Sequence, residues 1–180
     1  MADAIDALLS RARGARFENP AESKRELVEA VALARTAKDP MQLAQALTAL
    51  GQIESDLQHT KEALRLYLEA STLYRTAKAW LKLAHTVRHI ADICREQGLL
   101  KIAEPAYQEA MEIYRAHTDT PPLDLANALR GFALLKEAAG DPQTAMSLWE
   151  EAGKLYASVN VEAGMAESER RLALLKAQSE

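Results

Sequence analysis

The chain has 180 residues, of which 48% are hydrophobic, 27% are charged and only 5% are aromatic. This composition is typical of a soluble helical domain or a short repeat array, and the length is sufficient to bury a sizeable core. The formal net charge of -4 disfavours a general nucleic-acid binder, because such proteins are usually basic. The single cysteine excludes an internal disulfide and is typical of a reducing compartment.

The N-terminal stretch, MADAIDALLSRARGARFENP, does not have the pattern of a signal peptide. It carries acids at Asp3 and Asp6, and no long apolar run follows them. Nowhere does the chain contain about eighteen consecutive apolar residues, the length that spans a membrane. The sequence therefore predicts a cytoplasmic protein that has no membrane partner.

Capping signals and apolar periodicity divide the chain into nine predicted helices. Three of them begin at a capping side chain followed by proline, at Asn19-Pro20, Asp39-Pro40 and Asp141-Pro142. Gly98 and Gly140 mark two of the turns. The predicted helices cover residues 3–16, 20–37, 40–57, 60–78, 80–97, 99–117, 121–139, 141–158 and 160–177. No segment has the strict alternation of a strand.

Proline also occurs inside one predicted helix. Pro105 lies in the first part of the sixth helix, where it removes a backbone donor and crowds the preceding turn. We therefore expect this helix to start late or to bend in its first turn.

The helices repeat with a period of 40 to 42 residues. In the second helix of each pair, small and aromatic residues recur at Ala63, Tyr67, Ala70 and Tyr74, at Ala103, Tyr107, Ala110 and Tyr114, and at Ala145, Trp149, Ala152 and Tyr156. One helix pair cannot bury its apolar stripe alone, so stacked pairs form a continuous core. The expected core includes Leu47, Leu50, Tyr67, Val87, Ile90, Tyr107, Leu129, Phe132 and Trp149.

This pattern resembles the tetratricopeptide-repeat (TPR) family, and Gly51, Ala63, Tyr67 and Ala70 fit its motif best. The period of 40 to 42 residues is similar to the longer repeats of kinesin light chains and of GoLoco-binding adaptors. The resemblance implies an all-α, right-handed α-solenoid of antiparallel helix pairs. We expect a single domain over residues 1–180, with repeats at about 3–37, 40–78, 80–117 and 121–158 and a capping helix at 160–177.

The segment HTVRHIADICR, residues 85–95, raises the question of a metal or catalytic site. At 100° per residue, one side of this helix carries Trp80, Leu83, Val87, Ile90 and Cys94, and the opposite side carries His85, Arg88, His89, Asp92 and Arg95. Cys94 is therefore expected in the core, away from the histidines. His85 and His89 supply two metal ligands and Asp92 a third, whereas a zinc site usually has three or four ligands with further support. The sequence predicts no catalytic residue, metal or cofactor.

In the TPR family, the polar side of the first helix of each pair lines an inner groove. The resemblance therefore places the following residues in a candidate ligand groove: Gln45, Thr48, Gln52, His85, Arg88, His89, Asp92, Arg95, Asn127, Arg130, Arg170 and Arg171. Arg88, Arg130 and Arg170 stand at matching places and form what we call the arginine row. These arginines are either solvated ion pairs or a stripe for carboxylates, which the planar guanidinium binds in a bidentate way.

The predicted function is a non-enzymatic scaffold that binds another protein or peptide, with an acidic segment as one hypothesis. Two alternatives stay open. Leu172, Leu174 or Leu175 of the last helix could pack on a second copy in a homo-oligomer, and the two histidines could bind a metal. RNA binding along the arginine row is disfavoured by the acidic chain.

Overall fold

The computed structural model describes residues 1–178 and folds almost all of them into nine α-helices. The helices are α1 (Ala2–Ala15), α2 (Pro20–Ala37), α3 (Pro40–Asp56), α4 (Thr60–Thr76), α5 (Trp80–Glu96), α6 (Leu100–Ala116), α7 (Pro122–Ala138), α8 (Pro142–Ser158) and α9 (Glu162–Ala177). The described residues contain no strand, which confirms the all-α fold class. Every helix boundary lies within two residues of its predicted place.

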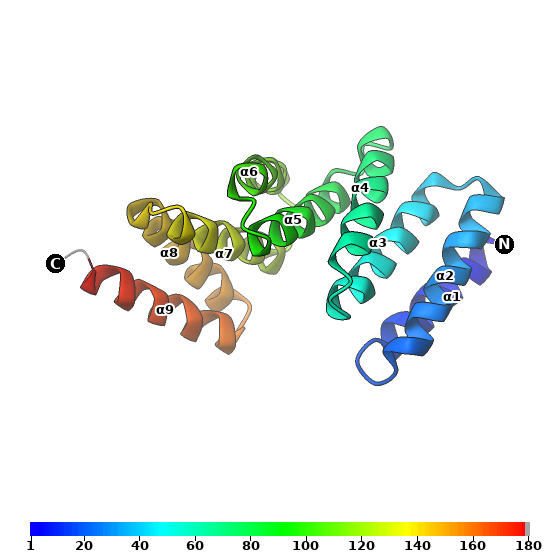
Figure 1. Ribbon diagram of the computed structural model, residues 1–180, viewed down its shortest axis with the longest axis horizontal. Helices are drawn as coiled ribbons and strands as arrows, with labels where there is room; N and C mark the ends of the chain where they lie inside the picture. The colour runs from blue at the N-terminus through cyan, green and yellow to red at the C-terminus, as the bar shows by residue number, and fades with distance from the viewer. Residues whose placement is uncertain (179–180) are drawn as a thin grey trace. The chain divides into compact units, whose positions relative to one another are not determined.

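The chain divides into two compact units, Met1–Thr86 and Val87–Glu180, and the border falls inside α5. In the first unit, α1 packs on α2, α2 on α3 and α3 on α4. In the second, α6 packs on α7, α7 on α8 and α8 on α9 (Figure 1). The single domain expected over residues 1–180 stays a prediction.

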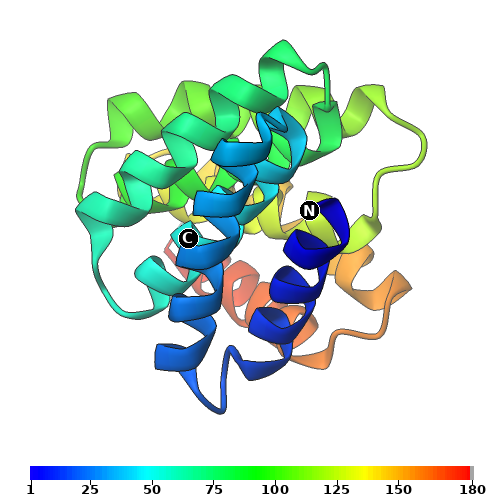
Figure 2. The same ribbon diagram turned by 90° about the vertical axis from the view of Figure 1, so that its right-hand side faces the viewer.

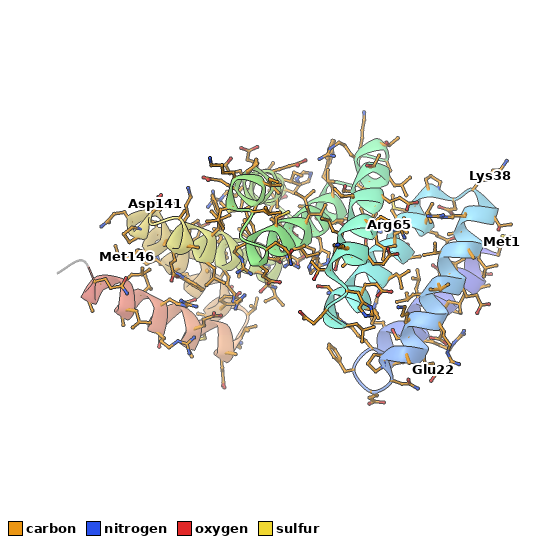
Figure 3. All side chains as sticks on the ribbon, in the orientation of Figure 1. Met1, Glu22, Lys38, Arg65, Asp141 and Met146 are labelled. Carbon is orange, nitrogen blue, oxygen red and sulfur yellow. The ribbon has the colours of Figure 1, made fainter. Side chains whose placement is uncertain are left out.

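Helix pairs are antiparallel, as the first pair shows clearly. Figures 1 and 2 both place α1 and α2 side by side. In Figure 3, Met1 and Lys38 lie at one end of this pair, and Glu22 lies at the other. From here on, α1, α3, α5, α7 and α9 are called A helices, and α2, α4, α6 and α8 are called B helices.

The three predicted caps fix three helix starts. Asn19 accepts a hydrogen bond from the backbone N–H of Glu22 at 3.2 Å, and its own amide donates to the Glu22 carboxylate at 2.8 Å. Asp39 accepts from two backbone N–H groups of α3, and Asp141 accepts from the N–H of Thr144 at 3.1 Å. Each cap satisfies amides that have no partner within the helix.

The structure confirms the two predicted glycine turns, whereas the helix that contains Pro105 does not start late. Gly98 and Gly140 have φ values of 73° and 77°, a left-handed conformation that glycine adopts without steric cost. Helix α6 begins at Leu100 and continues through Pro105, so the helix does not start after the proline. The carbonyl that loses its donor belongs to Lys101, an exposed residue, so water can solvate it.

The core is mostly as predicted, with two differences on α5. Tyr67, Tyr107, Leu129 and Trp149 are fully buried, and the other predicted core residues are buried except Ile90, which is half-buried. Trp80, expected on the core side, is 40% exposed. Trp80 is the first residue of its helix, so its side chain is at the edge of the packed layer, which periodicity alone does not reveal.

Cys94 is buried, as its place in the helical pattern predicts. Burial raises the pKa of the Cys94 thiol, because the apolar surroundings disfavour the charged thiolate. We expect the folded protein to react with a thiol reagent at least about tenfold more slowly than a small free thiol at pH 8. Absorbance during labelling with and without denaturant measures this difference. Equally fast labelling in both conditions would show that Cys94 does not face the core.

Candidate functional site

Neighbouring A helices lie beside one another within each unit. In the first unit, the Gln42 amide of α3 donates to the Asp6 carboxylate and the Ala2 carbonyl of α1, both at 3.2 Å. In the second unit, Arg130 of α7 binds Glu167 of α9. Helix α3 thus contacts α1 in the first unit, and α7 contacts α9 in the second. The polar sides of the A helices, which carry the residues predicted for the groove, are called the A-helix faces.

The A-helix face of the first unit displays mainly amides and hydroxyls. Gln45, Thr48 and Gln52 are half-buried on one side of α3. The Thr48 hydroxyl donates to the Ala44 carbonyl at 2.8 Å and lies 3.5 Å from the Tyr74 hydroxyl. Thr48 is thus held in place from its own helix and from the B helix α4.

Arg88 of α5 is largely enclosed, with 12% of its side chain exposed. Its guanidinium donates to the Asp92 carboxylate one turn later at 2.6 Å. A second guanidinium nitrogen lies 2.8 Å from Nε2 of His89, which must be the unprotonated nitrogen to accept this hydrogen bond. Arg88 is therefore already paired with groups of its own helix.

Asp92 also accepts a hydrogen bond from the hydroxyl of Tyr107 at 2.5 Å. Arg95 donates to the same hydroxyl at 3.2 Å and pairs with Glu96 at its exposed end. Burial, with Asp92 beside it, raises the pKa of the Tyr107 hydroxyl, so this group stays protonated and donates. The A-helix face in α5 is anchored by a B-helix tyrosine.

Arg130 and Glu167 form a bidentate ion pair between α7 and α9, with distances of 2.6 and 3.0 Å. Hydrogen bonds from Arg130 hold the pKa of the Glu167 carboxyl below its usual range. Arg170 is exposed and close enough to Glu167 to lower the same pKa further. Asn127, one turn before Arg130, accepts from the Tyr156 hydroxyl at 2.9 Å.

A second ion pair joins α7 and α9. Arg171 donates to the Glu137 carboxylate at 3.1 Å. The other oxygen of Glu137 accepts from the indole N–H of Trp149 at 2.6 Å. Helix α9 is therefore tied to α7 by Arg130 and Arg171 in opposite directions, which fixes its register.

Two of the three residues of the arginine row form ion pairs with carboxylates of the chain itself. Arg88 pairs with Asp92, and Arg130 pairs with Glu167. Arg170 is the exposed member. In the second unit, the charges of Arg88 and Arg130 are therefore balanced by carboxylates of the same chain.

The repeat pattern identifies Tyr74, Tyr114 and Tyr156, but it does not predict that the hydroxyls of Tyr74 and Tyr156 contact residues of the A-helix faces. Tyr74, Tyr114 and Tyr156 end three successive B helices and are almost fully buried. The hydroxyl of Tyr74 lies 3.5 Å from the Thr48 hydroxyl, and that of Tyr156 donates to Asn127 at 2.9 Å. Their spacing of 40 and 42 residues was the available signal, but periodicity could not show that the hydroxyls point toward the groove residues.

His85 and His89 lie one turn apart on α5, and both are half-buried. Within residues 1–178, no three histidine, cysteine or acidic side chains gather in a way that could hold a metal ion. His89 instead contacts Arg88.

The first unit contains a buried carboxylate outside the A-helix face. Glu54, at the end of α3, accepts from Lys24 at 2.8 Å and lies 2.7 Å from Nδ1 of His59. Burial by itself raises the pKa of Glu54, but hydrogen bonds from Lys24 and His59 outweigh this effect and hold the pKa below its usual range. This cluster joins α2, α3 and the start of α4.

The lowered pKa of Glu54 predicts an acid-sensitive contribution to stability. Its stabilisation is complete above the unfolded carboxyl pKa and is lost as pH falls through the lower folded pKa. Glu54→Gln is expected to cost about 1–3 kcal/mol at pH 7, and this cost should shrink as the pH is lowered toward 3. Urea unfolding at both pH values measures it, with the exposed Glu18→Gln as a control. A cost that does not change with pH would contradict the assignment.

Comparison with solved structures gives the fold. BtubC (BKLC) from P. vanneervenii superposes with a TM-score of 0.76 at 17% identity, over 87% of this chain and 64% of that one. The kinesin light chain TPR-like repeats of Podosopora anserina give 0.69 at 13% identity, over 98% and 96% of the two chains. MamA from Desulfovibrio magneticus RS-1 gives 0.62 at 14% identity, over 98% and 97%. The chain thus spans less than two thirds of BtubC.

No protein-family model matches the chain, and no curated protein has a significantly similar sequence. The structural matches and the helix pairs nevertheless define a TPR-like helical-repeat fold, which confirms the resemblance seen in Gly51, Ala63, Tyr67 and Ala70. No helix within residues 1–178 is both long enough and apolar enough to cross a membrane.

Proposed function

We propose that the chain is a non-enzymatic scaffold that binds a segment of a partner protein along its A-helix faces. The observation that carries this proposal is the presence, in each unit, of half-buried polar side chains on the A helices, at positions that the core does not use. The proposed lining residues are Gln45, Thr48, Gln52, His85, Arg88, His89, Asp92, Arg95, Asn127, Arg130, Arg170 and Arg171. Buried tyrosine hydroxyls hold several of them in fixed positions before any partner binds, which lowers the entropic cost of binding.

The TPR-like fold supports an interaction scaffold as a general class. This support is an analogy of fold, and function depends on the particular site. The ion pairs already present at the site determine how an acidic ligand could bind. An acidic segment would have to replace Asp92 and Glu167 as partners of Arg88 and Arg130.

A comparison of two triple variants tests the proposal. Arg88, Arg130 and Arg170 are changed to alanine in one protein. The other carries Arg25→Ala, Lys61→Ala and Lys101→Ala, which remove the same charge from exposed B-helix positions. If the arginine row is part of the binding surface, partners captured from a lysate of the source cells should decrease in the first protein only. Circular dichroism establishes that both variants are folded.

Equal capture of all partners by the native protein and by both triple variants would show that the arginine row is outside the binding surface. Specific partners absent from all three samples would contradict the scaffold function itself. Measuring capture at several salt concentrations distinguishes binding through exposed charges from binding through uncharged groups, because exposed charge contacts weaken as ionic strength rises.

Self-association through α9 is the second candidate function. Leu175 is buried within its own chain, whereas Leu174 is 51% exposed. Leu174→Glu should therefore abolish a dimer that depends on this face. Light scattering at several concentrations measures the mass, and a monomer at every concentration would exclude the candidate.

A further inference from the structure

Helix α3 differs from the other A helices in the charge of its polar side. Residues 40–53 contain no charged side chain. At 1.5 Å per residue this uncharged stretch is about 20 Å long. On α5, α7 and α9, by contrast, the polar side carries charged residues such as Arg88, Arg130 and Glu167, paired with one another or with neighbours.

Charges border this stretch in the first unit at both ends, and they are taken up by contacts within the chain. At the C-terminal end, Asp56 pairs with Arg16 at 2.8 Å, and Glu54 is buried with Lys24 and His59. The other charges are at the N-terminal end. The Asp6 carboxylate accepts from the amide of Gln42, and Lys82 points its ammonium toward the sulfur of Met41 at 4.0 Å. Between these two ends, residues 41–53 of the α3 face offer a ligand no counter-charge.

The open groups on this face are carboxamides. Gln45 and Gln52 are half-buried, and no hydrogen bond involving either side chain occurs within residues 1–178. They lie seven residues apart on one side of α3, which places them about 10 Å apart along its axis. Three residues of extended peptide advance the same distance of about 10 Å.

A carboxamide both donates and accepts hydrogen bonds, as a peptide unit does. Two carboxamides at this separation can each pair with the backbone N–H and C=O of an extended chain. An ionised ligand side chain placed on the same half-buried surface would lose hydration without meeting an opposite charge, and this is unfavourable.

From these observations we infer that the α3 face in the first unit binds an uncharged, polar, extended segment of a partner protein, and that Gln45 and Gln52 determine this preference. The inference rests on the proposed scaffold function and specifies its ligand class. It also predicts that binding depends only weakly on salt, since no ion pair forms between this face and the ligand.

Selection from a random library of twelve-residue peptides, displayed on phage, tests the ligand class with the full chain as bait. Enriched peptides should carry no net charge, and their affinities should change less than about twofold between 0.05 and 0.5 M NaCl. Replacing both Gln45 and Gln52 with alanine should weaken the selected peptides at least about tenfold, because up to four neutral hydrogen bonds are lost. Gln108→Ala with Gln143→Ala, on exposed B-helix positions, should leave affinity unchanged.

Three outcomes overturn the inference, and they separate it from the proposed function. Enrichment of acidic peptides that bind the glutamine variant normally but fail to bind the Arg88, Arg130 and Arg170 variant would refute the uncharged ligand and keep the scaffold. Uncharged peptides that bind both glutamine variants equally would place the binding surface away from α3. Enrichment no greater than on bare support would contradict the scaffold function together with the inference.

Discussion

Replacement of Tyr107 by alanine is expected to lower the free energy of unfolding by about 3–5 kcal/mol, the usual cost of truncating a buried aromatic residue. Tyr107 is fully buried, and its ring stacks on Phe132 with centroids 5.8 Å apart. Its hydroxyl also donates to Asp92, so truncation leaves a partly buried carboxylate with one partner fewer. Urea unfolding followed by circular dichroism measures the loss.

The two contributions of Tyr107 can be separated. Tyr107→Phe keeps the ring and removes the hydrogen bond to a charged acceptor, so we expect a loss of about 1.5–3 kcal/mol. Phe17→Ala is the control, because Phe17 is 83% exposed and should change stability by less than about 0.5 kcal/mol. A loss below about 1 kcal/mol for Tyr107→Ala would show that this tyrosine does not support the core.

Gly131→Ala is expected to destabilise the protein by about 1–3 kcal/mol, although alanine is the better helix former. A Cβ atom at Gly131 would lie 2.7 Å from the Tyr107 hydroxyl and 2.8 Å from an oxygen of Asp92. The methyl group would thus compete with the hydrogen bond that joins α6 to α5. Thermal or urea unfolding of the variant gives the effect.

Gly14→Ala supplies the matched control for this prediction. Gly14 also lies in a helix, and a Cβ atom there would meet no other atom within 4 Å. Alanine should therefore stabilise the protein at this position by about 0.5–1 kcal/mol. Stabilisation at both glycines would show that the contact around Gly131 is looser than the structure indicates.

Local and periodic signals explain why so much of the fold is readable in the sequence. Asn19, Asp39 and Asp141 cap helices through contacts within one turn, so their effect does not depend on the rest of the chain. The repeat of small and aromatic residues predicts which side of each helix is buried, and the burial of Cys94 and Trp149 confirms it. Trp80 is the exception, because a side chain at a helix end depends on where its neighbours stop.

For the candidate site, the sequence predicts the positions of the residues but not their ion-pair partners. Repeat alignment predicts that Arg88, Arg130 and Arg170 share a side of the A helices. The bounds of α5, α7 and α9, the helices that carry them, agree with the predicted ranges. Alignment left open whether the arginines are paired. Whether they contact a partner protein stays a prediction.

The sequence by itself determined the helices, their period and their buried sides, because these depend on residues within a few turns of one another. Only the tertiary structure decided the partners of the polar groups. Arg130 and Glu167 are 37 residues apart, and Arg171 and Glu137 are 34 apart. Such pairs form only when packing sets the spacing and rotation of α7 against α9 to within the length of a hydrogen bond. That requirement exceeds what a repeat period specifies, since the same period is compatible with arginines that are paired or open.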